Sequence, residues 1–402
     1  MVKMQKAYRF RAYPSHEQKS LLDRQMYLSK RLYNLLLEKS QSHYKDYGKT
    51  FTKYDMNKWM TSLKKKNPEF RELYSQASQN VADRVAKAYQ NFFRRVRERK
   101  KNKSVKVGFP RFKKFVSSIT YPQAYNGCLH LERKRAEFLK IGRINFVNHR
   151  EIEGNIKTAS IKKTKSGEWY VTISTEFEDT PTFNNGKPKV GIDLGIKEYA
   201  TLSDGKKIPN PKILKKMEMR FKDAQRELSQ RKKGGKNRRK SIQKIARISE
   251  HIARQREDYL HKLSDNLVNS YSFIAYEELN IVGMVRNHSL AKSITDVSWA
   301  QFIQFLCYKA ESAGCRVVGV NPKNTSKMCN ECGNIQETPL SERTYLCGKC
   351  SMSMDRDLNA AKNILNRATE GQSGSYASGD HVRPRIQEAT VVESGTTFGG
   401  AS

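Results

Sequence analysis

The sequence predicts a multidomain protein of the α+β class, and three of its features support this prediction. A strand-like N-terminus and a group of short strands enclose a long helical stretch, the second half alternates strands with helices, and a compact four-cysteine segment lies near the end. The chain has 402 residues, 37% of them apolar, so it is long enough for two to three domains.

The charge balance is strongly positive, with 76 Lys and Arg against 40 Asp and Glu and a formal net charge of +36. Such an excess excludes an ordinary metabolic enzyme and requires a polyanionic partner, either nucleic acid or an acidic membrane surface. Membrane-surface helices place bulky apolar residues opposite their charges, whereas here the basic residues come in blocks along the chain. We therefore expect nucleic acid, bound with a strong dependence on salt.

The N-terminus and the cysteines indicate the cellular compartment. Residues 1–14 are basic and lack an apolar core, and no stretch approaches about 18 uncharged apolar residues. Four of the seven cysteines form two tight pairs, and the others, Cys128, Cys307 and Cys315, lack the spacing of a disulfide framework. We expect a protein of the reducing cytosol that is neither secreted nor membrane-spanning.

Two blocks of basic residues are candidates for nucleic-acid contacts. Residues 94–106 include eight Lys or Arg near several phenylalanines, and residues 231–240 include seven around a Gly-Gly pair that predicts the exposed tip of a helical hairpin. Basic side chains beside aromatic rings suit a nucleic-acid groove, although each ring could equally belong to the core. The candidate residues are Arg94, Arg95, Arg97, Lys100, Lys101, Arg231, Lys232, Lys233, Arg238 and Arg239.

The first half of the chain predicts a β domain with helices inserted into it. Alternation over residues 6–13 indicates a strand, leucine spacing predicts helices from Pro14 to about Lys101, and Gly108-Phe109-Pro110 ends them. Further strands are expected at 118–121, 139–141, 158–161 and 169–173, and with the first strand they could form one barrel. The predicted boundaries are 1–15 for the strand, 16–110 for the helical lobe, 111–180 for the barrel and 181–188 for a linker.

The second half has the element order of an RNase H-like fold. Its predicted elements are strands at 189–195, 198–203 and 206–208, a helical hairpin, a strand at 272–279, a helix at 299–313, a strand at 316–320 and a helix at 358–367. This domain is expected to cover residues 189–320 and 354–370, with a cysteine segment at 321–353 inserted before its last helix. Residues 371–402, rich in Gly, Ser and Thr, predict a flexible tail.

Carboxylates stand at the ends of three of these predicted elements. Asp193 lies opposite the apolar face of its strand between two glycines, which we expect to leave room for metal ions and a phosphate backbone. Glu277 and Glu278 end another strand, and only one of them should face Asp193 because neighbouring strand residues point to opposite faces. Asp357 opens the last helix on the face that includes Ala361, which is expected to face the sheet.

Each carboxylate alone has an ordinary explanation, such as a strand-end turn, a solvated strand end or a helix N-cap. As a set, Asp193, Glu277 and Asp357 fall on the first strand, the fourth strand and the last helix of the predicted domain. Two Mg²⁺ ions about 3.5–4 Å apart can activate a water and stabilise a leaving oxygen, and carboxylate oxygens suit them. The set therefore predicts a two-metal phosphodiesterase site.

The cysteine segment is the most specific local pattern in the chain. Cys329-x2-Cys332 and Cys347-x2-Cys350, with 14 residues between them, have the spacing of a tetrahedral zinc site. Four cysteines leave no coordination position open, so we expect one structural zinc ion. A catalytic zinc ion and a pair of disulfides are the alternatives.

Taken together, these motifs resemble those of the TnpB family, also called OrfB. The motifs are Gly191 to Gly195, Ala275 to Ile281, Thr325-Ser326 before the first cysteine pair, the two cysteine pairs, and Asp355 to Ile364. Residues 6–14 are similar to the family's opening, and residues 108–113 to its junction between helices and barrel. The resemblance implies a transposon-encoded, RNA-guided DNA endonuclease related to the type V CRISPR effectors, which cuts double-stranded DNA beside a short flanking motif.

The resemblance also implies roles for residues. Asp193, Glu277 and Asp357 match the three RuvC carboxylates that would hold two Mg²⁺ ions, with Glu278 and Asp355 as second choices. The cysteine segment matches a zinc-bearing element that binds the target nucleic acid. Residues 16–110 match the recognition lobe, the barrel matches the wedge domain that holds the guide RNA, and residues 189–320 with 354–370 match the RuvC nuclease.

The flanking motif would be read by the N-terminal part of the protein. Side-chain amides suit adenine edges, which makes Gln76, Gln79 and Asn80 candidates, although the three could simply lie on a helix surface. The implied partners are a guide RNA from the transposon end and double-stranded target DNA, with no membrane. We expect a monomer in the RNA complex, in the bacterial or archaeal cytosol and associated with the nucleoid.

Three other functions would use a similar chain. A guide-directed DNA-binding repressor would occupy its target without cleavage, a transposase or strand-transfer accessory protein would join transposon ends, and a junction resolvase would need no RNA. The chain substitutes none of the three catalytic carboxylates, which argues against the repressor.

Overall fold

The computed structural model describes residues 2–179, 186–339 and 342–370. The contacts divide the chain into two compact units, one formed by residues 1–180 with 227–247 and the other by residues 181–226 with 248–402. Most of the predicted linker and the whole predicted tail lie outside the described residues.

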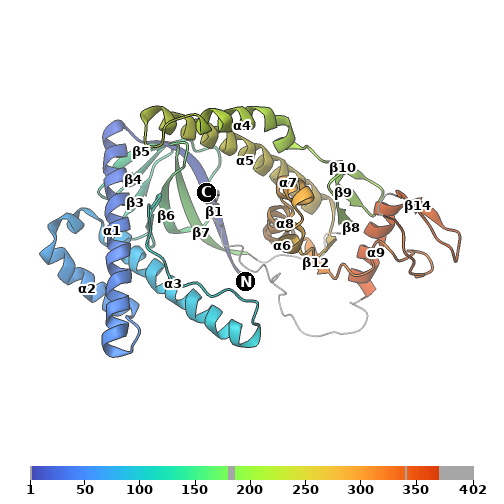
Figure 1. Ribbon diagram of the computed structural model, residues 1–402, viewed down its shortest axis with the longest axis horizontal. Helices are drawn as coiled ribbons and strands as arrows, with labels where there is room; N and C mark the ends of the chain where they lie inside the picture. The colour runs from blue at the N-terminus through green and yellow to red at the C-terminus, as the bar shows by residue number, and fades with distance from the viewer. Residues whose placement is uncertain (1, 180–185, 340–341, 371–402) are drawn as a thin grey trace. The chain divides into compact units, whose positions relative to one another are not determined.

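The first unit contains a seven-stranded antiparallel sheet with the order β2-β6-β7-β1-β5-β4-β3 (Figure 1). Strand β1 pairs with β7 along eleven residues and continues against β5, so the N-terminal strand joins a sheet built mainly by later residues. The strands are β1 (Val2–Tyr13), β2 (Ser118–Tyr121), β3 (Leu129–Leu131), β4 (Arg135–Phe138), β5 (Gly142–Phe146), β6 (Asn155–Lys163) and β7 (Trp169–Asp179).

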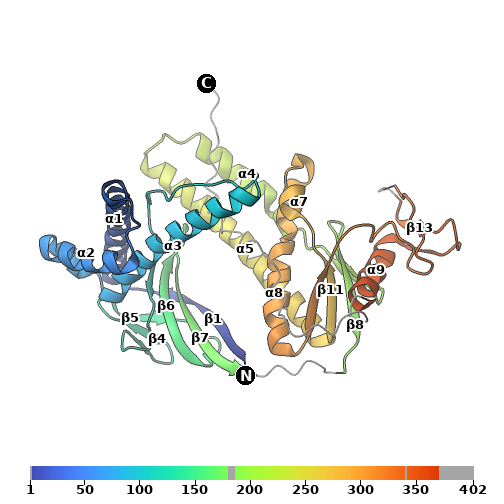
Figure 2. The same cartoon turned by 90° about the horizontal axis from the view of Figure 1, so that it is seen from below.

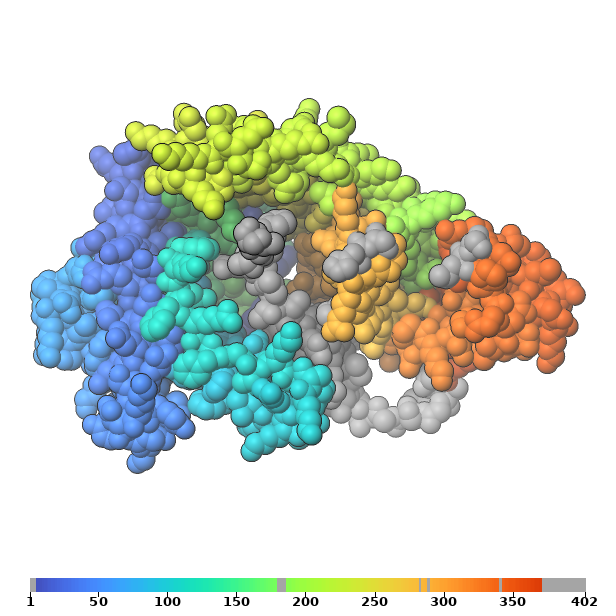
Figure 3. Space-filling view, viewed as in Figure 1, coloured from blue at the N-terminus to red at the C-terminus, as the bar shows by residue number. Residues whose placement is uncertain are grey.

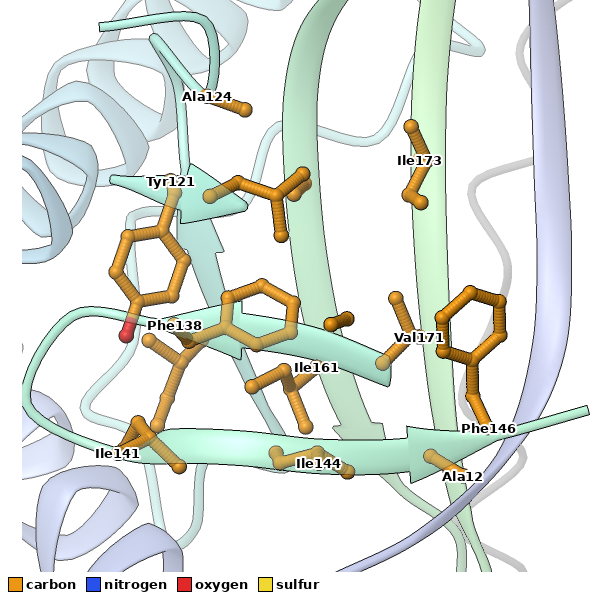
Figure 4. Close-up of a cluster of buried hydrophobic side chains, with 14 of the residues drawn as sticks. Ala12, Tyr121, Ala124, Phe138, Ile141, Ile144, Phe146, Ile161, Val171 and Ile173 are labelled. Atoms are coloured by element: carbon orange, nitrogen blue, oxygen red, sulfur yellow. The ribbon is translucent and has the colours of Figure 1, made fainter. Parts of the chain in front are cut away.

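This sheet curls around its own apolar core, because side chains from near its two edges meet. The rings of Tyr121 on β2 and Phe138 on β4 lie 5.3 Å apart between centroids, and the Tyr121 hydroxyl donates to the Leu139 carbonyl. Figure 4 shows their side chains directed into the same interior as Ile161 and Val171. Strands β2 and β3 remain the two edge strands in the order of the sheet.

The strands predicted at 118–121, 158–161 and 169–173 are confirmed, and the last two extend further than expected. The strand predicted at 139–141 is wrong, because those residues form the turn between β4 and β5. Lys140 has a φ of 66° there, and Leu139 is 41% exposed. Leu139 and Ile141 lie within this turn, so their apolar side chains do not alternate along a strand.

A helical lobe lies between β1 and β2 in the sequence. It comprises α1 (His16–Tyr47), α2 (Lys53–Lys66), a short 3₁₀ helix η1 (Pro68–Glu72) and α3 (Ser75–Lys101). Helix α1 starts with a capping box between Ser15 and Gln18 and ends at Gly48, whose φ of 64° is easily reached by glycine. Apolar side chains of α1, α2 and α3 form a separate core that includes Leu32, Met56 and Val85.

The second unit contains a five-stranded mixed sheet with the order β10-β9-β8-β11-β12. Strands β8, β9 and β10 are antiparallel neighbours, whereas β11 runs parallel to both β8 and β12. The strands are β8 (Lys189–Leu194), β9 (Glu198–Leu202), β10 (Lys207–Pro209), β11 (Phe273–Glu277) and β12 (Arg316–Val320).

Six helices accompany this sheet among the described residues: α4 (Ile213–Ser229), α5 (Lys236–Ser270), α6 (Ile281–Met284), α7 (His288–Val297), α8 (Trp299–Ala313) and α9 (Arg356–Glu370). The predicted strands, helical hairpin and last helix are confirmed, and the short α6 and α7 were not predicted. The last helix starts two residues earlier than expected, at Arg356.

The two faces of this sheet pack against different helices. Ile274 and Tyr276 of β11 join the core formed with α5 and α8, whereas Phe273 and Ala275 contact Ile364 of α9 on the other face. Figure 2 shows α8 and α9 on opposite sides of the sheet. A Cβ atom added to Gly191 on β8 would lie 2.9 Å from the Leu365 backbone nitrogen, so α9 rests directly on this strand.

The four-cysteine segment lies between β12 and α9. It contains the two-stranded pair β13 (Thr344–Leu346) and β14 (Ser353–Asp355). This segment, coloured orange to red in Figure 3, is at the surface in the space-filling view. Across the described part of the chain, none of the helices is both long and apolar enough to cross a membrane.

The contact between α9 and β8 predicts the effect of a single methyl group. Gly191→Ala should reduce the free energy of unfolding by about 2–4 kcal/mol, because the new Cβ would overlap the α9 backbone, which cannot move aside like a flexible side chain. Gly108→Ala is the matched control, since a Cβ there would meet no atom within 4 Å. Denaturant unfolding measures both variants, and equal stabilities would contradict the contact.

Candidate functional site

Asp193 and Glu277 lie side by side on neighbouring strands. The parallel ladder between β8 and β11 pairs Ile192 with Tyr276, so the next residues, Asp193 and Glu277, are level with each other. Alternation along each strand directs both side chains to the face that α9 covers, with Gly191 before Asp193 and Ala275 before Glu277. The two carboxylates therefore share one face at the carboxyl ends of two parallel strands.

Glu278, the residue after Glu277, does not lie beside Asp193. Strand β11 ends at Glu277, which is 8% exposed, whereas Glu278 is exposed. The Glu278 side chain lies against Gly319 of β12, where an added Cβ would come within 2.7 Å of the Glu278 Cγ. The geometry thus favours Glu277 as the carboxylate beside Asp193.

Asp357 lies in the first turn of α9, and Asp355 is the residue that caps this helix. The Asp355 carboxylate accepts hydrogen bonds from the backbone N–H groups of Asp357 (2.9 Å) and Leu358 (3.2 Å). It also accepts one from Lys207 Nζ at 2.6 Å. The N-cap role considered for Asp357 therefore belongs to Asp355, and the Asp357 carboxylate has a looser contact, 3.7 Å from an Arg343 guanidinium nitrogen.

The other acidic groups are close enough to Asp193 for their charges to act on its pKa. Burial and, to a smaller extent, the negative charges of Glu277, Asp357 and Asp355 together raise the pKa of Asp193 to about 8, against the opposing effect of the Arg356 guanidinium. Burial also raises the pKa of Glu277, against the opposing effects of a hydrogen bond from Thr325 and the charge of Arg367. Burial acts in the same sense on Asp355, but its hydrogen bond from Lys207 and its two backbone donors leave that pKa below its usual value.

The carboxylate oxygens nevertheless do not form a tight cage. Within the described residues, the four cysteines are the one group of three or more His, Cys, Asp or Glu side chains whose ligand atoms all lie within 4.8 Å. The oxygens of Asp193, Glu277 and Asp357 are therefore spread more widely than the four sulfur atoms.

The two glycines beside Asp193 do not have the role that we expected from the sequence. A Cβ at Gly191 would meet the backbone of α9, and a Cβ at Gly195 would lie 2.8 Å from the Glu198 carbonyl oxygen. Protein backbone, not a metal ion or a phosphate, thus fills the space on both sides of Asp193. Gly191 lets α9 approach the sheet, and with it Asp357 approaches Asp193.

The four cysteines form a compact cluster of thiols. The Sγ atoms of Cys329 and Cys350 are 3.7 Å apart, and those of Cys332 and Cys347 are 3.6 Å apart. A disulfide requires about 2.05 Å, so the pairs are not disulfides, and all seven cysteines are free thiols. Four sulfur ligands around a tetrahedral zinc ion with bonds of about 2.3 Å would be about 3.8 Å apart, which is compatible with this cluster.

The basic candidates have different environments. Arg94 and Arg97 are exposed on α3, and Arg231, Lys232 and Lys233 are exposed between α4 and α5. Arg238 instead closes this turn, because its guanidinium donates to the carbonyls of Leu228 (2.9 Å) and Arg231 (3.1 Å). The aromatic rings near the first block pack on one another, with Phe92 and Phe109 5.1 Å apart between centroids. Phe109 is nevertheless 48% exposed, so this aromatic group is only partly a core.

Of the three amides considered for reading DNA, Gln76 lies inside the protein. Its side-chain oxygen accepts a hydrogen bond from the Gln123 N–H at 3.2 Å, and only 8% of the residue is exposed. This packing of α3 against the loop after β2 gives Gln76 a structural contact. Gln79 is exposed and Asn80 is half-buried.

Three side chains that contact the acidic residues were not predicted from the sequence to do so. They are Thr325, which donates to Glu277, Lys207, which pairs with Asp355, and Arg343, which approaches Asp357. In the sequence, Thr325 was noted only as part of a motif before the first cysteine pair. Lys207 and Arg343 carry no local signal, because the sequence contains many basic residues and nothing marks which of them meet an acid.

Known protein families match three parts of the chain. The family OrfB_IS605, described as "Probable transposase", matches residues 172–288, and the family Cas12f1-like, TNB domain matches residues 299–364. A third, described as a helix-turn-helix domain, matches residues 1–49. In that region the structure has strand β1 followed by the single helix α1.

Individual relatives match almost the whole chain. A protein of Streptomyces pristinaespiralis named "Putative RNA-guided DNA endonuclease" is 32% identical over 98% of this chain and 96% of its own length. InsQ of Escherichia coli K12, with the same description, is 28% identical over 90% of this chain and 92% of its own. A solved Cas12f1–sgRNA–target DNA complex covers 91% of this chain and 99% of its own, with a TM-score of 0.57 and 14% identity, which shows a shared fold. The chain belongs to the OrfB family, also called TnpB.

Proposed function

We propose that this protein is an RNA-guided endonuclease of a transposable element that cleaves double-stranded DNA beside a short flanking motif. The observation that carries the proposal is the grouping of Asp193, Glu277 and Asp357, from three distant parts of the chain, on one face of the second sheet. Burial, together with the negative charges of the neighbouring acids, raises the pKa of Asp193 to about 8. The names of the full-length relatives support the RNA guide and the DNA target.

The reaction in this proposal is Mg²⁺-dependent hydrolysis of a phosphodiester bond by an RNase H-like domain of the RuvC type. The donor set fits two Mg²⁺ ions, since hard carboxylate oxygens are their usual protein ligands and buried like charges are stabilised by a cation. When bound, the ions would activate the attacking water and stabilise the leaving oxygen. Asp193, Glu277 and Asp357 would hold them, while Asp355 stays occupied with the N–H groups of α9 and with Lys207.

The division of labour along the chain follows from the same proposal. The curled sheet of the first unit would act as the wedge barrel that holds guide RNA, and helices α1 to α3 would act as the recognition lobe. The four cysteines would hold one structural zinc ion, with no position left open for catalysis. The net charge of +36 supports contacts with RNA and DNA backbones, which we propose are made in the cytosol by a monomeric protein in complex with its RNA.

A pair of adjacent glutamates gives a matched test of the nuclease. Glu277→Gln should reduce the rate of cleavage of a matched plasmid in Mg²⁺ by at least about 100-fold, because it removes a charge that would hold the metal ions. Glu278→Gln should stay within about threefold of the wild type, since Glu278 is exposed and faces away. The assay uses the protein purified with its coexpressed RNA.

Several results would reject the nuclease. A wild-type complex that binds the matched target without cutting it would indicate the repressor, and joined transposon ends would indicate strand transfer. Cutting that survives complete removal of the RNA would indicate a resolvase. Equal rates for Glu277→Gln and Glu278→Gln would contradict the assignment of the site.

The raised pKa of Asp193 predicts a stability that depends on pH. Because the folded protein keeps this proton up to about pH 8 while the unfolded chain loses it near 3.8, stability falls between these values. Asp193→Asn removes this destabilisation. In the absence of Mg²⁺, its free energy of unfolding relative to that of the wild type should therefore increase by about 1–3 kcal/mol when the pH is raised from about pH 5.5 to about pH 8.5. Asp355→Asn, where the pKa is lowered, should show no such change over this range.

Unfolding of the zinc-loaded protein at the two pH values, without chelator, measures these differences. An Asp193→Asn variant whose stability relative to the wild type is the same at both pH values would contradict the buried repulsion.

The cysteine cluster predicts one zinc ion in each chain. Cys347→Ala should lose it, because the cluster would keep only three of four ligands. Cys307→Ala should retain it, since Cys307 is a free thiol on α8 outside the cluster. Elemental analysis of the purified variants measures the metal, and a wild type without zinc would contradict the assignment.

A further inference from the structure

We propose that Thr325 is a positioning residue, which fixes the Glu277 carboxylate so that one of its oxygens is presented to a metal ion. Thr325 acts from the loop that connects β12 to the first cysteine pair, called here the leading loop (residues 321–328). This inference rests on the proposed nuclease function of Glu277.

The contact is a buried hydrogen bond between two side chains. Thr325 Oγ1 donates to Glu277 Oε1, and the exposed fractions of the two residues are 3% and 8%. The Pro322 carbonyl lies 3.0 Å from the same hydroxyl. A hydroxyl has only one proton to donate, and a bond to a carboxylate is the stronger of the two choices.

The hydrogen bond restricts a side chain that would otherwise be mobile. Glutamate rotates about three bonds, whereas the β-branched threonine is stiff at its first bond. With Oε1 held by Thr325, the carboxylate plane is set, and Oε2 accepts no hydrogen bond from the described residues. Hydrogen bonds of this kind typically strengthen metal binding by about 10–100-fold.

Helix α9 holds the leading loop in place. Asn363 is 1% exposed, and its Nδ2 donates to the Thr325 carbonyl at 2.9 Å and to the Met328 carbonyl at 2.7 Å. Asn359, which is fully buried, donates to the Met328 carbonyl at 2.8 Å and accepts from the Asn330 N–H at 3.0 Å. An amide ladder on α9 thus fixes both Thr325 and the start of the cysteine segment.

The same helix therefore sets two of the three carboxylates. Asp357 belongs to its first turn, and Glu277 is reached two turns further along through Asn363 and Thr325. The leading loop is the direct connection between the cysteine cluster and Glu277. The Thr325 hydroxyl is directed at Glu277, whereas the neighbouring Ser326 makes no hydrogen bond with Glu277.

Substitutions of similar shape separate the hydroxyl from packing. Thr325→Val keeps the volume and removes the donor, Thr325→Ser keeps the donor, and Ser326→Ala removes the adjacent hydroxyl. Each full-length protein is titrated with Mn²⁺ in the absence of nucleic acid, and bound ion is measured by electron paramagnetic resonance. We expect Thr325→Val to weaken Mn²⁺ binding about tenfold and the other two variants to stay within about twofold.

A double-mutant cycle then tests whether Thr325 acts through Glu277. In a Glu277→Gln background, Thr325→Val should weaken Mn²⁺ binding no further, because the carboxylate that it orients is gone. In the cleavage assay, Thr325→Val should need about tenfold more Mg²⁺ for half-maximal rate, while target binding stays unchanged.

The outcomes distinguish this inference from the nuclease proposal. If the wild type binds Mn²⁺ but does not cut DNA, the proposed nuclease function is rejected. The Mn²⁺ titrations still decide the role of Thr325. Unchanged or tighter Mn²⁺ binding by Thr325→Val, the same loss in the Glu277→Gln background, or no Mn²⁺ binding by the wild type would overturn the inference. Zinc content and melting temperature check folding, and Thr325→Ala replaces Thr325→Val if that variant does not fold.

Discussion

The direct packing of α9 on β8 is the contact on which the candidate site depends. Gly191 lets the helix backbone approach the strand, and the first turn of the helix brings Asp357 near Asp193. Parallel pairing of β8 with β11 adds Glu277 at the same level. A sheet and one helix thus collect three acids that are far apart in the sequence, and Asp355 keeps the helix start in place by capping its free N–H groups.

In the protein without metal ions, this arrangement places carboxylates where their negative charges repel one another. The pKa of Asp193 is raised because burial and three neighbouring acids all disfavour its charge. Ordinary cores avoid such groups, whereas a site that binds cations can use the repulsion to favour binding. The side chains that offset it are specific: Thr325 donates to Glu277, and Lys207 pairs with Asp355.

Much of this architecture could be predicted from the sequence, because hydrophobic period and element order carry it. Helix α8 and strand β12 were predicted to the residue. For the second carboxylate, the sequence left Glu277 and Glu278, and the choice depended on which of them shares the face of Asp193. The rest depends on contacts between distant segments. The sequence could not show that α9 fills the space above Gly191, that Gln76 is buried against Gln123, or that residues 139–141 turn between β4 and β5. Family resemblance supplied the roles of the carboxylates, which their local patterns alone left open.

The most direct test of the central claim is to locate bound metal ions by anomalous X-ray scattering from crystals soaked in Mn²⁺. We predict anomalous density bounded by the carboxylates of Asp193, Glu277 and Asp357, and its loss in a Glu277→Gln crystal. Density that instead lies at Asp355 or Glu278, or no density near Asp193 at saturating Mn²⁺, would contradict it.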